Sequence, residues 1–353
     1  MRPEVQALSA YHVPDTGDVV KLDAMENPYA WPGEALRSAW LETLAGVSAN
    51  RYPDPRAPGV VERLRKHLAL PDQQRLLLGN GSDELIQLVT LALAKPGAKV
   101  LVPEPTFVMY RMIAIFCGVE CIGVPLRDDF GLDVEAMEAA IDEHDPAVTW
   151  LAWPNNPTGT LWPRADVHRI LEKSGGLVVV DEAYQPFAGD SFVDELGQWD
   201  NLVVLRTLSK LGLAGLRLGA LAGPAQWLDE IDKLRLPYNI NVLTQASAAF
   251  ALDHFDALAA QAATIREQRE RMTARLGELP GVTVHPSSAN FLLVRLPPGR
   301  ARAVFDQLRA DGILVKCLDG SHPLLADCLR LTIGTPDEND RLFGALEAQL
   351  AAA

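Results

Sequence analysis

The sequence predicts an α/β protein with a large domain built on a mainly parallel sheet of seven strands and a smaller α+β domain. The first observation is an alternation of short apolar runs and helical segments from Gln74 onwards, the pattern of a parallel sheet covered on both faces. The second is the length of 353 residues, more than one small core supports. The third is a different order of strands and helices after residue 282.

The predicted elements of the first part follow from apolar runs and from turn residues. Residues 1–29 carry little periodicity, so we expect an arm there, followed by a large domain at 47–262 and a small domain made of 30–46 and 263–353. Strands are expected at 75–78, 99–102, 119–124, 148–152, 177–180, 202–205 and 217–222. Helices are expected at 33–45, 60–68, 82–94, 106–116, 134–141 and 164–172.

The tail has its own pattern. A long helical region at 242–279 is expected to break or bend, and a helix is expected at 302–311. Strands are expected at 282–284, 290–295, 313–316 and 328–333. The final helix begins at Thr335, where Thr335 and Glu338 form a capping box and Pro336 takes the first helical position.

Composition excludes several classes of partner. The net charge of −14 argues against nucleic acid and against an anionic membrane surface. No signal peptide and no apolar run of membrane-spanning length is visible, so we expect a soluble, cytoplasmic protein. The cysteines have no zinc-ligand spacing, so no metal is expected, and they suit buried thiols in a reducing compartment. They are Cys117, Cys121, Cys317 and Cys328.

Lys210 follows the predicted strand 202–205 and the short segment 206–209. A residue just past the C-terminal end of a buried strand lies where open α/β sheets bind their ligands. Arg206 and Arg217 are close in sequence, and nearby cations favour the neutral amine that a lysine needs to form a Schiff base. Taken alone, Lys210 favours the simpler interpretation, an exposed lysine in a loop.

The turn at 79–83, with the sequence GNGSD, joins a predicted strand to a predicted helix. Glycines let the backbone approach a ligand closely, and the N–H groups at the start of a helix can hold a phosphate. The turn matches neither the dinucleotide fingerprint nor the Walker loop. An ordinary turn capped by Ser82 is the alternative.

Two further loops follow predicted strands. The sequence PNNPTG at 154–159 has a backbone restricted by prolines and presents Asn156, and DEAY at 181–184 places Asp181 directly after a buried run. A buried acid needs a partner, and the pyridinium N–H of a pyridoxal ring is one that a carboxylate can bind. A β-turn at Asn156 and a helix N-cap at Asp181 are the alternatives.

In combination, these pieces resemble the fold-type I pyridoxal 5′-phosphate (PLP) enzymes. They occur in the order GNGSDE, PNNPTG, DEAY and then SK followed by an arginine. Within that superfamily the whole chain is most similar to the histidinol-phosphate aminotransferases. The pieces that carry this resemblance are 26–28, 51–53, 79–84, 105–107 with Tyr110, 207–210, 214–217, 289–291 and 328–334.

The resemblance implies PLP as the cofactor and a role for each matching residue. Lys210 forms the Schiff base and carries the proton between the substrate Cα and the cofactor C4′, while Asp181 pairs with the pyridinium nitrogen. The other cofactor contacts that it implies are Tyr184 and Asn156 at the ring oxygen, Phe107 stacked on the ring, Ser82, Asp83, Thr207, Ser209 and Arg217 around the phosphate, and Tyr52 of the partner subunit in a homodimer.

The resemblance also implies the substrates, L-histidinol phosphate and 2-oxoglutarate, in a step of histidine biosynthesis. Arg330 binds the anionic group, either the α-carboxylate of glutamate or the phosphate, because a guanidinium fork suits both. Lys316 and Tyr11 are expected to help bind the phosphate, and Asn156 and Asn27 to face the substrate. For Lys316, a surface lysine at a strand end is the alternative.

The sequence departs from the family pattern at three places. Met25 stands where many members have asparagine, Phe107 replaces tyrosine, and the stretch from Lys210 to Arg217 is one residue shorter than in many members. Three other functions are considered: an aminotransferase of aromatic amino acids, a threonine-phosphate decarboxylase, and a transcription regulator with an aminotransferase-like domain. The net charge and the early start of the arm argue against the regulator.

Overall fold

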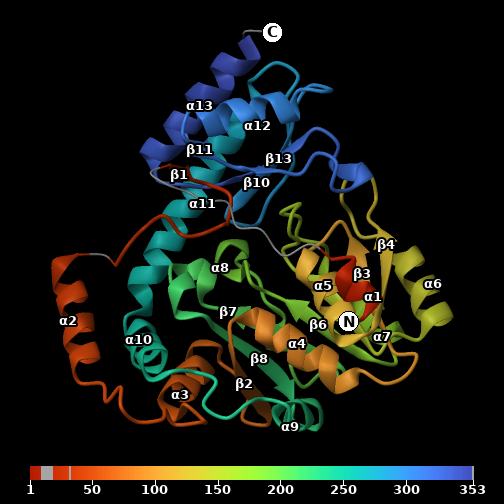
Figure 1. Cartoon of the computed structure of the whole chain (residues 1–353), viewed down its shortest axis with the longest axis vertical. Coiled ribbons are helices and arrows are strands. Elements are labelled where there is room, and N and C mark those ends of the chain that lie inside the picture. Colours follow the sequence, from red (N-terminus) through yellow and green to blue (C-terminus); the bar gives the residue numbers. More distant parts are fainter. Residues whose placement is uncertain (9–18, 32, 352–353) are drawn as a thin grey trace.

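A mixed sheet of seven strands organises the larger part of the molecule in the computed structural model, which describes residues 1–8, 19–31 and 33–351 (Figure 1). In spatial order the strands are β2 (Gln74–Asn80), β8 (Leu218–Pro224), β7 (Leu202–Thr207), β6 (Leu177–Asp181), β5 (Val148–Ala152), β3 (Lys99–Glu104) and β4 (Glu120–Pro125). Strand β8 is antiparallel to both of its neighbours, and the other pairs are parallel. The predicted mainly parallel seven-stranded sheet is confirmed.

Helices cover both faces of this sheet. One face packs against α4 (Ser82–Leu93), α5 (Val108–Cys117) and α9 (Ala225–Asp232), and the other against α6 (Val134–His144) and α7 (Arg164–Lys173). Alternate side chains of β6 belong to the two different cores, because successive residues of a strand point to opposite faces. Val178 and Val180 lie in one core, and Leu177 and Val179 in the other. Helix α9 was not predicted from the sequence.

A second, antiparallel sheet lies in the upper part of the molecule in Figure 1. Its strands are, in order, β12 (Lys316–Cys317), β13 (Cys328–Thr332), β10 (Phe291–Arg295) and β9 (Thr283–Val284), and it is accompanied by α11 (Phe255–Gly277), α12 (Ala301–Ala310) and α13 (Pro336–Ala351). The predicted capping box is confirmed: Thr335 N–H donates to Glu338 Oε2 at 2.8 Å, and Glu338 N–H to Thr335 Oγ1 at 3.3 Å.

The single strand predicted at 313–316 is wrong, because two strands occupy it. Strand β11 (Ile313–Leu314) pairs in parallel with β1 (Val20–Lys21) of the arm, whereas β12 pairs with β13. The backbone therefore changes partner at Val315. The arm is anchored further where Thr332 N–H donates to the carbonyl of Leu22 at 3.0 Å.

The remaining elements are short or lie at the periphery of the two sheets. They are α1 (Pro3–Gln6), α2 (Glu34–Ala45), α3 (Pro58–His67), α8 (Gln185–Ala188), α10 (Val242–Asp253) and the 3-10 helices η1 (Phe192–Glu195), η2 (Ser209–Leu211), η3 (Ala214–Leu216) and η4 (Pro323–Leu325). The break predicted within 242–279 lies at His254, between α10 and α11. Helix α2 lies against α10, where Trp40 Nε1 donates to Ser247 Oγ at 3.0 Å. The predicted domain boundaries stay a prediction.

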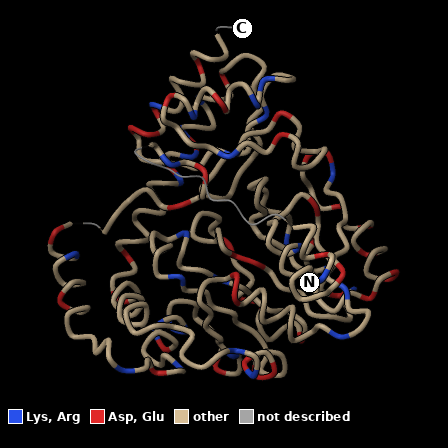
Figure 2. Tube along the Cα trace, in the orientation of Figure 1, with Lys and Arg blue, Asp and Glu red and all other residues tan. Residues whose placement is uncertain are grey.

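Charges are distributed over both parts of the chain trace, with Lys and Arg interspersed among Asp and Glu (Figure 2). Some of them tie helices together, as Arg271 of α11 does with Asp340 of α13 at 2.6 Å. Among the helices of the described residues, none has the length and apolar character that crossing a membrane requires.

Candidate active site

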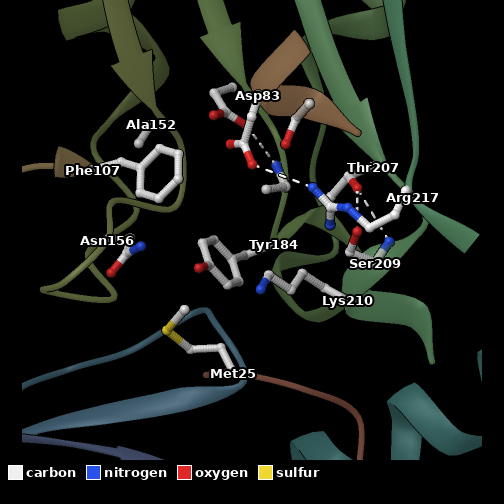
Figure 3. A pocket seen from close by; sticks show the side chains of 13 residues that line it. Met25, Asp83, Phe107, Ala152, Asn156, Tyr184, Thr207, Ser209, Lys210 and Arg217 are labelled. Carbon is white, nitrogen blue, oxygen red and sulfur yellow. Dashed lines mark hydrogen bonds and ion pairs between the residues drawn. The ribbon is translucent and has the colours of Figure 1, made fainter. Parts of the chain in front are cut away.

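The carboxyl ends of several strands meet at one cavity, which we call the inner cavity (Figure 3). Ala152 ends β5, Asp181 ends β6 and Thr207 ends β7. Parallel strands place their carboxyl ends at the same edge, so residues far apart in sequence converge there. The inner cavity is lined by Met25, Ser82, Asp83, Phe107, Ala152, Asn156, Asp181, Ala183, Tyr184, Thr207, Ser209, Lys210 and Arg217.

Lys210, in the 3-10 turn η2, points its amine into the inner cavity. Its Nζ donates to the carbonyl of Ala24 at 3.2 Å and lies 5.8 Å from the centre of the Tyr184 ring. The side chain is half-buried by surface area, yet the protein encloses the amine closely. Lost hydration, followed by the cations Arg330 and Arg217, lowers the pKa of Lys210 to about 8. A substantial fraction of the amine is therefore neutral near pH 8.

The expected effect of Arg206 on Lys210 is wrong. Arg206 Nε lies 2.8 Å from Glu182 Oε2, and that carboxylate is fully buried. Burial lowers the pKa of Arg206, and the ion pair with Glu182 opposes that effect. A strand alternates its side chains between faces, so closeness in sequence did not bring Arg206 to the amine.

Asp181 is buried at the end of β6 and has two hydrogen-bond donors. The Tyr110 hydroxyl donates to its Oδ2 at 2.6 Å, and the Ala183 N–H to its Oδ1 at 3.0 Å. Burial raises the pKa of Asp181 to about 6, and these donors oppose that rise. The pKa of Tyr110 is raised well above its ordinary value by burial and by Asp181, so the phenol keeps its proton.

The turn after β2 forms an anion cradle at the start of α4. Gly81 takes the N-cap position at φ +85°, and no side chain of the described residues caps the helix. A Cβ on Gly81 would lie 2.5 Å from Arg217 Nη2, so only glycine lets the guanidinium approach this closely. Arg217 Nη2 also lies 3.3 Å from Asp83 Oδ2. The alternative with Ser82 as the cap is wrong, because Ser82 is already the first helical residue.

A larger cavity of about 580 Å³ adjoins the inner one, and we call it the outer cavity. Met25, Phe107 and Asn156 line both cavities, and Arg330, Lys316 and His322 line the outer one. Its size lies within the range of small-molecule sites, about 300–1,000 Å³.

Two cations stand side by side in the outer cavity. Lys316 of β12 and Arg330 of β13 are direct partners in the antiparallel ladder, which places their side chains on the same face. Arg330 Nη1 donates to Asn156 Oδ1 at 2.5 Å, and Nη2 to the carbonyl of Asp23 at 2.8 Å. The pair brings two positive charges to the wall of the outer cavity, an arrangement that suits an anionic group.

Two of the predicted site residues are not among the described residues that line either cavity of this chain. Tyr52 is 81% exposed and stacks on Tyr238, with ring centres 4.6 Å apart. Asn27 lies beside the loop that carries Lys210, where its Nδ2 donates to Gln261 Oε1 at 3.1 Å. It is not among the described residues that line either cavity. Tyr11 lies outside the described residues.

Two residues of the site were missed as contacts. Tyr110 was noted only as part of the sequence resemblance, although it lies in the first turn of α5 and its ring centre is 5.5 Å from that of Phe107, the N-cap residue. Met25 was noted only for the asparagine that it replaces, although it lines both cavities. The periodicity of α5 could have indicated Tyr110, but no pattern in the arm indicated Met25.

Comparisons with known proteins agree with this geometry. Residues 17–346 match the model of the family described as aminotransferase class I and II. Histidinol-phosphate aminotransferase 2 of Nitrosococcus oceani is 54% identical over 99% of this chain and 96% of its own length. The histidinol-phosphate aminotransferase of Chromobacterium violaceum is 53% identical over 98% of this chain and 97% of its own length.

Solved structures share the fold. The histidinol-phosphate aminotransferase of Sinorhizobium meliloti, in complex with PLP, has a TM-score of 0.89 and 26% identity over 100% of this chain and 98% of its own. An L-threonine-O-3-phosphate decarboxylase of Porphyromonas gingivalis has a TM-score of 0.80 at 24% identity, over 94% of this chain and 100% of its own, and shows the fold alone. The chain belongs to the class I and II aminotransferases and, among them, to the histidinol-phosphate aminotransferases.

Proposed function

We propose that this chain is a PLP-dependent aminotransferase that converts L-histidinol phosphate and 2-oxoglutarate into imidazole-acetol phosphate and L-glutamate, a step of histidine biosynthesis. The observation that carries the proposal is the joining of two cavities. The inner one holds Lys210, Asp181 and an uncapped helix start, and the outer one holds the adjacent cations Lys316 and Arg330.

The inner cavity fits PLP at three places. The uncapped start of α4, with Arg217 against Gly81, suits the phosphate. Asp181, which already accepts two hydrogen bonds, can accept a third from the pyridinium N–H. Lys210 supplies an amine of lowered pKa. When bound, PLP supplies an electron sink for the charge that develops at the substrate Cα.

The chain's own residues then divide the remaining work. The Lys210 amine would accept the proton from the substrate Cα and carry it back to the reacting group, which requires a base of pKa near the working pH. Asp181 would hold the ring nitrogen in its protonated form, and Arg330 with Lys316 would orient the anionic group of each substrate. We also propose contacts to the cofactor from Ser82, Asp83, Phe107, Asn156, Tyr184, Thr207, Ser209 and Arg217.

The visible absorption spectrum of the purified protein tests the function. Glutamate and histidinol phosphate, added separately, should each bleach the band of bound PLP, and histidinol phosphate should do so at a far lower concentration than phenylalanine. Release of carbon dioxide from threonine phosphate, with no response to glutamate, would assign the decarboxylase activity instead. No visible band after PLP is supplied would overturn the proposal.

Tyr110→Phe tests how the ring-binding acid is held. Loss of the hydroxyl donor removes a hydrogen bond to a charged group, worth about 1.5–3 kcal/mol, so the pKa of Asp181 should rise by about one to two pH units. Pairing with the pyridinium needs the carboxylate, so PLP binding weakens as pH falls through the pKa of Asp181, and in the variant this weakening begins at a higher pH. The dissociation constant of PLP, titrated against pH in apoprotein, measures the shift. Tyr29→Phe, which removes a hydroxyl elsewhere, should leave the profile unchanged.

A homodimer with shared sites belongs to the proposal. Tyr52 is 81% exposed and Leu236 is 72% exposed, and an outward-facing tyrosine cannot serve the inner cavity of its own chain in this position. We propose that Tyr52 of the partner subunit reaches the cofactor phosphate. The alternative is that Tyr52 has a role only at the surface of its own chain. Mixing two variants of the protein distinguishes these two roles.

Subunit complementation measures this sharing. Tyr52→Ala alone should bind PLP about tenfold more weakly or worse, since a hydrogen bond to phosphate is lost, and Lys210→Ala alone should be inactive. When the two variants are mixed in equal amounts and their subunits reassociate, half of the dimers contain one subunit of each kind. Each of these dimers has one complete site out of two, so at limiting PLP about a quarter of wild-type activity should return. If the mixture were no more active than the Tyr52→Ala protein that it contains, a shared site would be contradicted.

We further propose that the enzyme acts in the cytoplasm. All four cysteines are free thiols, as suits a reducing compartment. Burial raises the pKa of Cys121 and of Cys328 to about 11, which makes both thiols unreactive. Fractionation of cells that produce the protein tests the location.

A further inference from the structure

Met25 lies where the inner and outer cavities meet. Its side chain lines both of them, and only 8% of its surface is exposed. In Figure 3 it enters the site from the side of the arm and points toward the space between Asn156 and Lys210. Together with Phe107 and Asn156, which also line both cavities, Met25 borders the space between Lys210 and Arg330.

The backbone of Met25 is held in an unusual conformation. Its φ of +52° is left-handed, a region that costs free energy for a residue with a Cβ and that persists where the surroundings enforce it. Two buried partners do so: Met25 N–H donates to Thr332 Oγ1 at 3.1 Å, and Asn290 Nδ2 donates to the Met25 carbonyl at 2.9 Å. These contacts determine the direction in which the side chain leaves the backbone.

The same segment is tied to the two cations of the site. Arg330 donates to the carbonyl of Asp23 at 2.8 Å, and Lys210 to the carbonyl of Ala24 at 3.2 Å. Met25 follows directly in the chain. Its side chain is therefore held at a set place relative to the amine and to the guanidinium.

The two amino-group donors differ in what they present to Met25. Both offer an anion to Arg330, but histidinol phosphate also carries an imidazole ring, whereas glutamate carries a second carboxylate. A thioether packs favourably against an aromatic ring, and an unbranched side chain adapts to its shape. A carboxylate gains neither a hydrogen bond nor a charge from methionine.

We infer that Met25 is a specificity-determining residue whose thioether contacts the imidazole ring of histidinol phosphate and favours that substrate over glutamate. The inference rests on the proposed function and adds a contact that distinguishes the two half-reactions. Under this inference the arm contributes to the choice between substrates, together with Lys316 and Arg330 of the antiparallel sheet.

Single-turnover kinetics with each donor, followed by the visible band of bound PLP, test this role. Met25→Ala should lower the apparent affinity for histidinol phosphate by about fivefold to tenfold, since a thioether–aromatic contact is lost, and leave the glutamate half-reaction unchanged. Met25→Leu keeps the apolar volume and should lose less. Met25→Gly removes the side chain and suits the left-handed backbone, so it replaces the alanine variant if that protein misfolds.

Met272→Leu is the matched control, because Met272 is 1% exposed within the same hydrophobic cluster on α11. It should not change the ratio between the two substrates. Equal losses on both donors in the Met25 variants would refute the inference and leave the proposed function intact. Wild-type protein that does not react with histidinol phosphate would refute both.

Discussion

Lys210→Ala lowers turnover by at least about 10⁴-fold, since the same amine acts as nucleophile and as proton carrier, and acid–base catalysis alone contributes about 10²–10⁴-fold. The protein should still fold. The pKa of Lys210 is depressed in the folded state, so the charged amine costs stability below pH 8, and its removal relieves that cost. Steady-state rates and thermal unfolding of the apoprotein measure the two effects.

Lys210→Arg is the control for charge. It keeps a cation in the inner cavity but offers no neutral amine, because a guanidinium stays protonated. We expect it to be as inactive as the alanine variant, with PLP bound weakly in both. Substantial activity in either protein would contradict the role of Lys210 and with it the mechanism.

Asp181→Asn has the second-largest expected effect. Asparagine has nearly the same shape and its amide oxygen can still accept from the Tyr110 hydroxyl, but it has no charge to hold the proton on the pyridinium nitrogen. Removing one preorganised electrostatic contact of this kind costs about 10²–10³-fold in kcat. Single-turnover rates with saturating substrate measure the loss, and the absorption of bound PLP reports the changed protonation of its ring.

Glu182→Gln provides the matched comparison. Glu182 is the next residue and is also buried, but it pairs with Arg206 on the other side of the strand. Breaking that pair should lower Tm, because a buried charge is left without its partner, while the spectrum of bound PLP stays that of the wild type. If Glu182→Gln changed the spectrum as Asp181→Asn does, the assignment of the ring contact to Asp181 would fail.

Local pattern determined most of the large sheet. Strand β5 occupies the predicted residues 148–152, because all of its residues but Thr149 are apolar and both of its faces are buried. The capping box at Thr335 and Glu338 was equally predictable, since two side chains three residues apart satisfy each other's backbone donors. Such features need no information from distant parts of the chain.

Short elements were harder to predict for a physical reason. Strand β1 has two residues, and its partner β11 comes from the opposite end of the sequence, so no local periodicity reports the pairing. The same pairing splits the strand predicted at 313–316. The helix α9 was missed, although it follows Pro224 directly and buries Leu228 and Ile231.

The site, like the fold, could be predicted from the sequence only in part. The order of the motifs determined which residues take part: Lys210, Asp181, Asn156 and Arg217 all line the inner cavity, and Arg330 lines the outer one, as the sequence predicted. For Asp181, Asn156 and Lys210 this was possible because each lies at or shortly after the end of a strand that its own apolar residues identify, whereas Arg217 and Arg330 were indicated by their motifs.

Only the tertiary structure decided which partners these residues have. In the folded chain Arg330, and not Arg206, helps to lower the pKa of Lys210, a phenol from α5 donates to Asp181, and Met25 of the arm lines both cavities. Electrostatic and packing forces act through space, so residues far apart in sequence can set a pKa or shape a binding surface that the neighbouring residues leave undetermined.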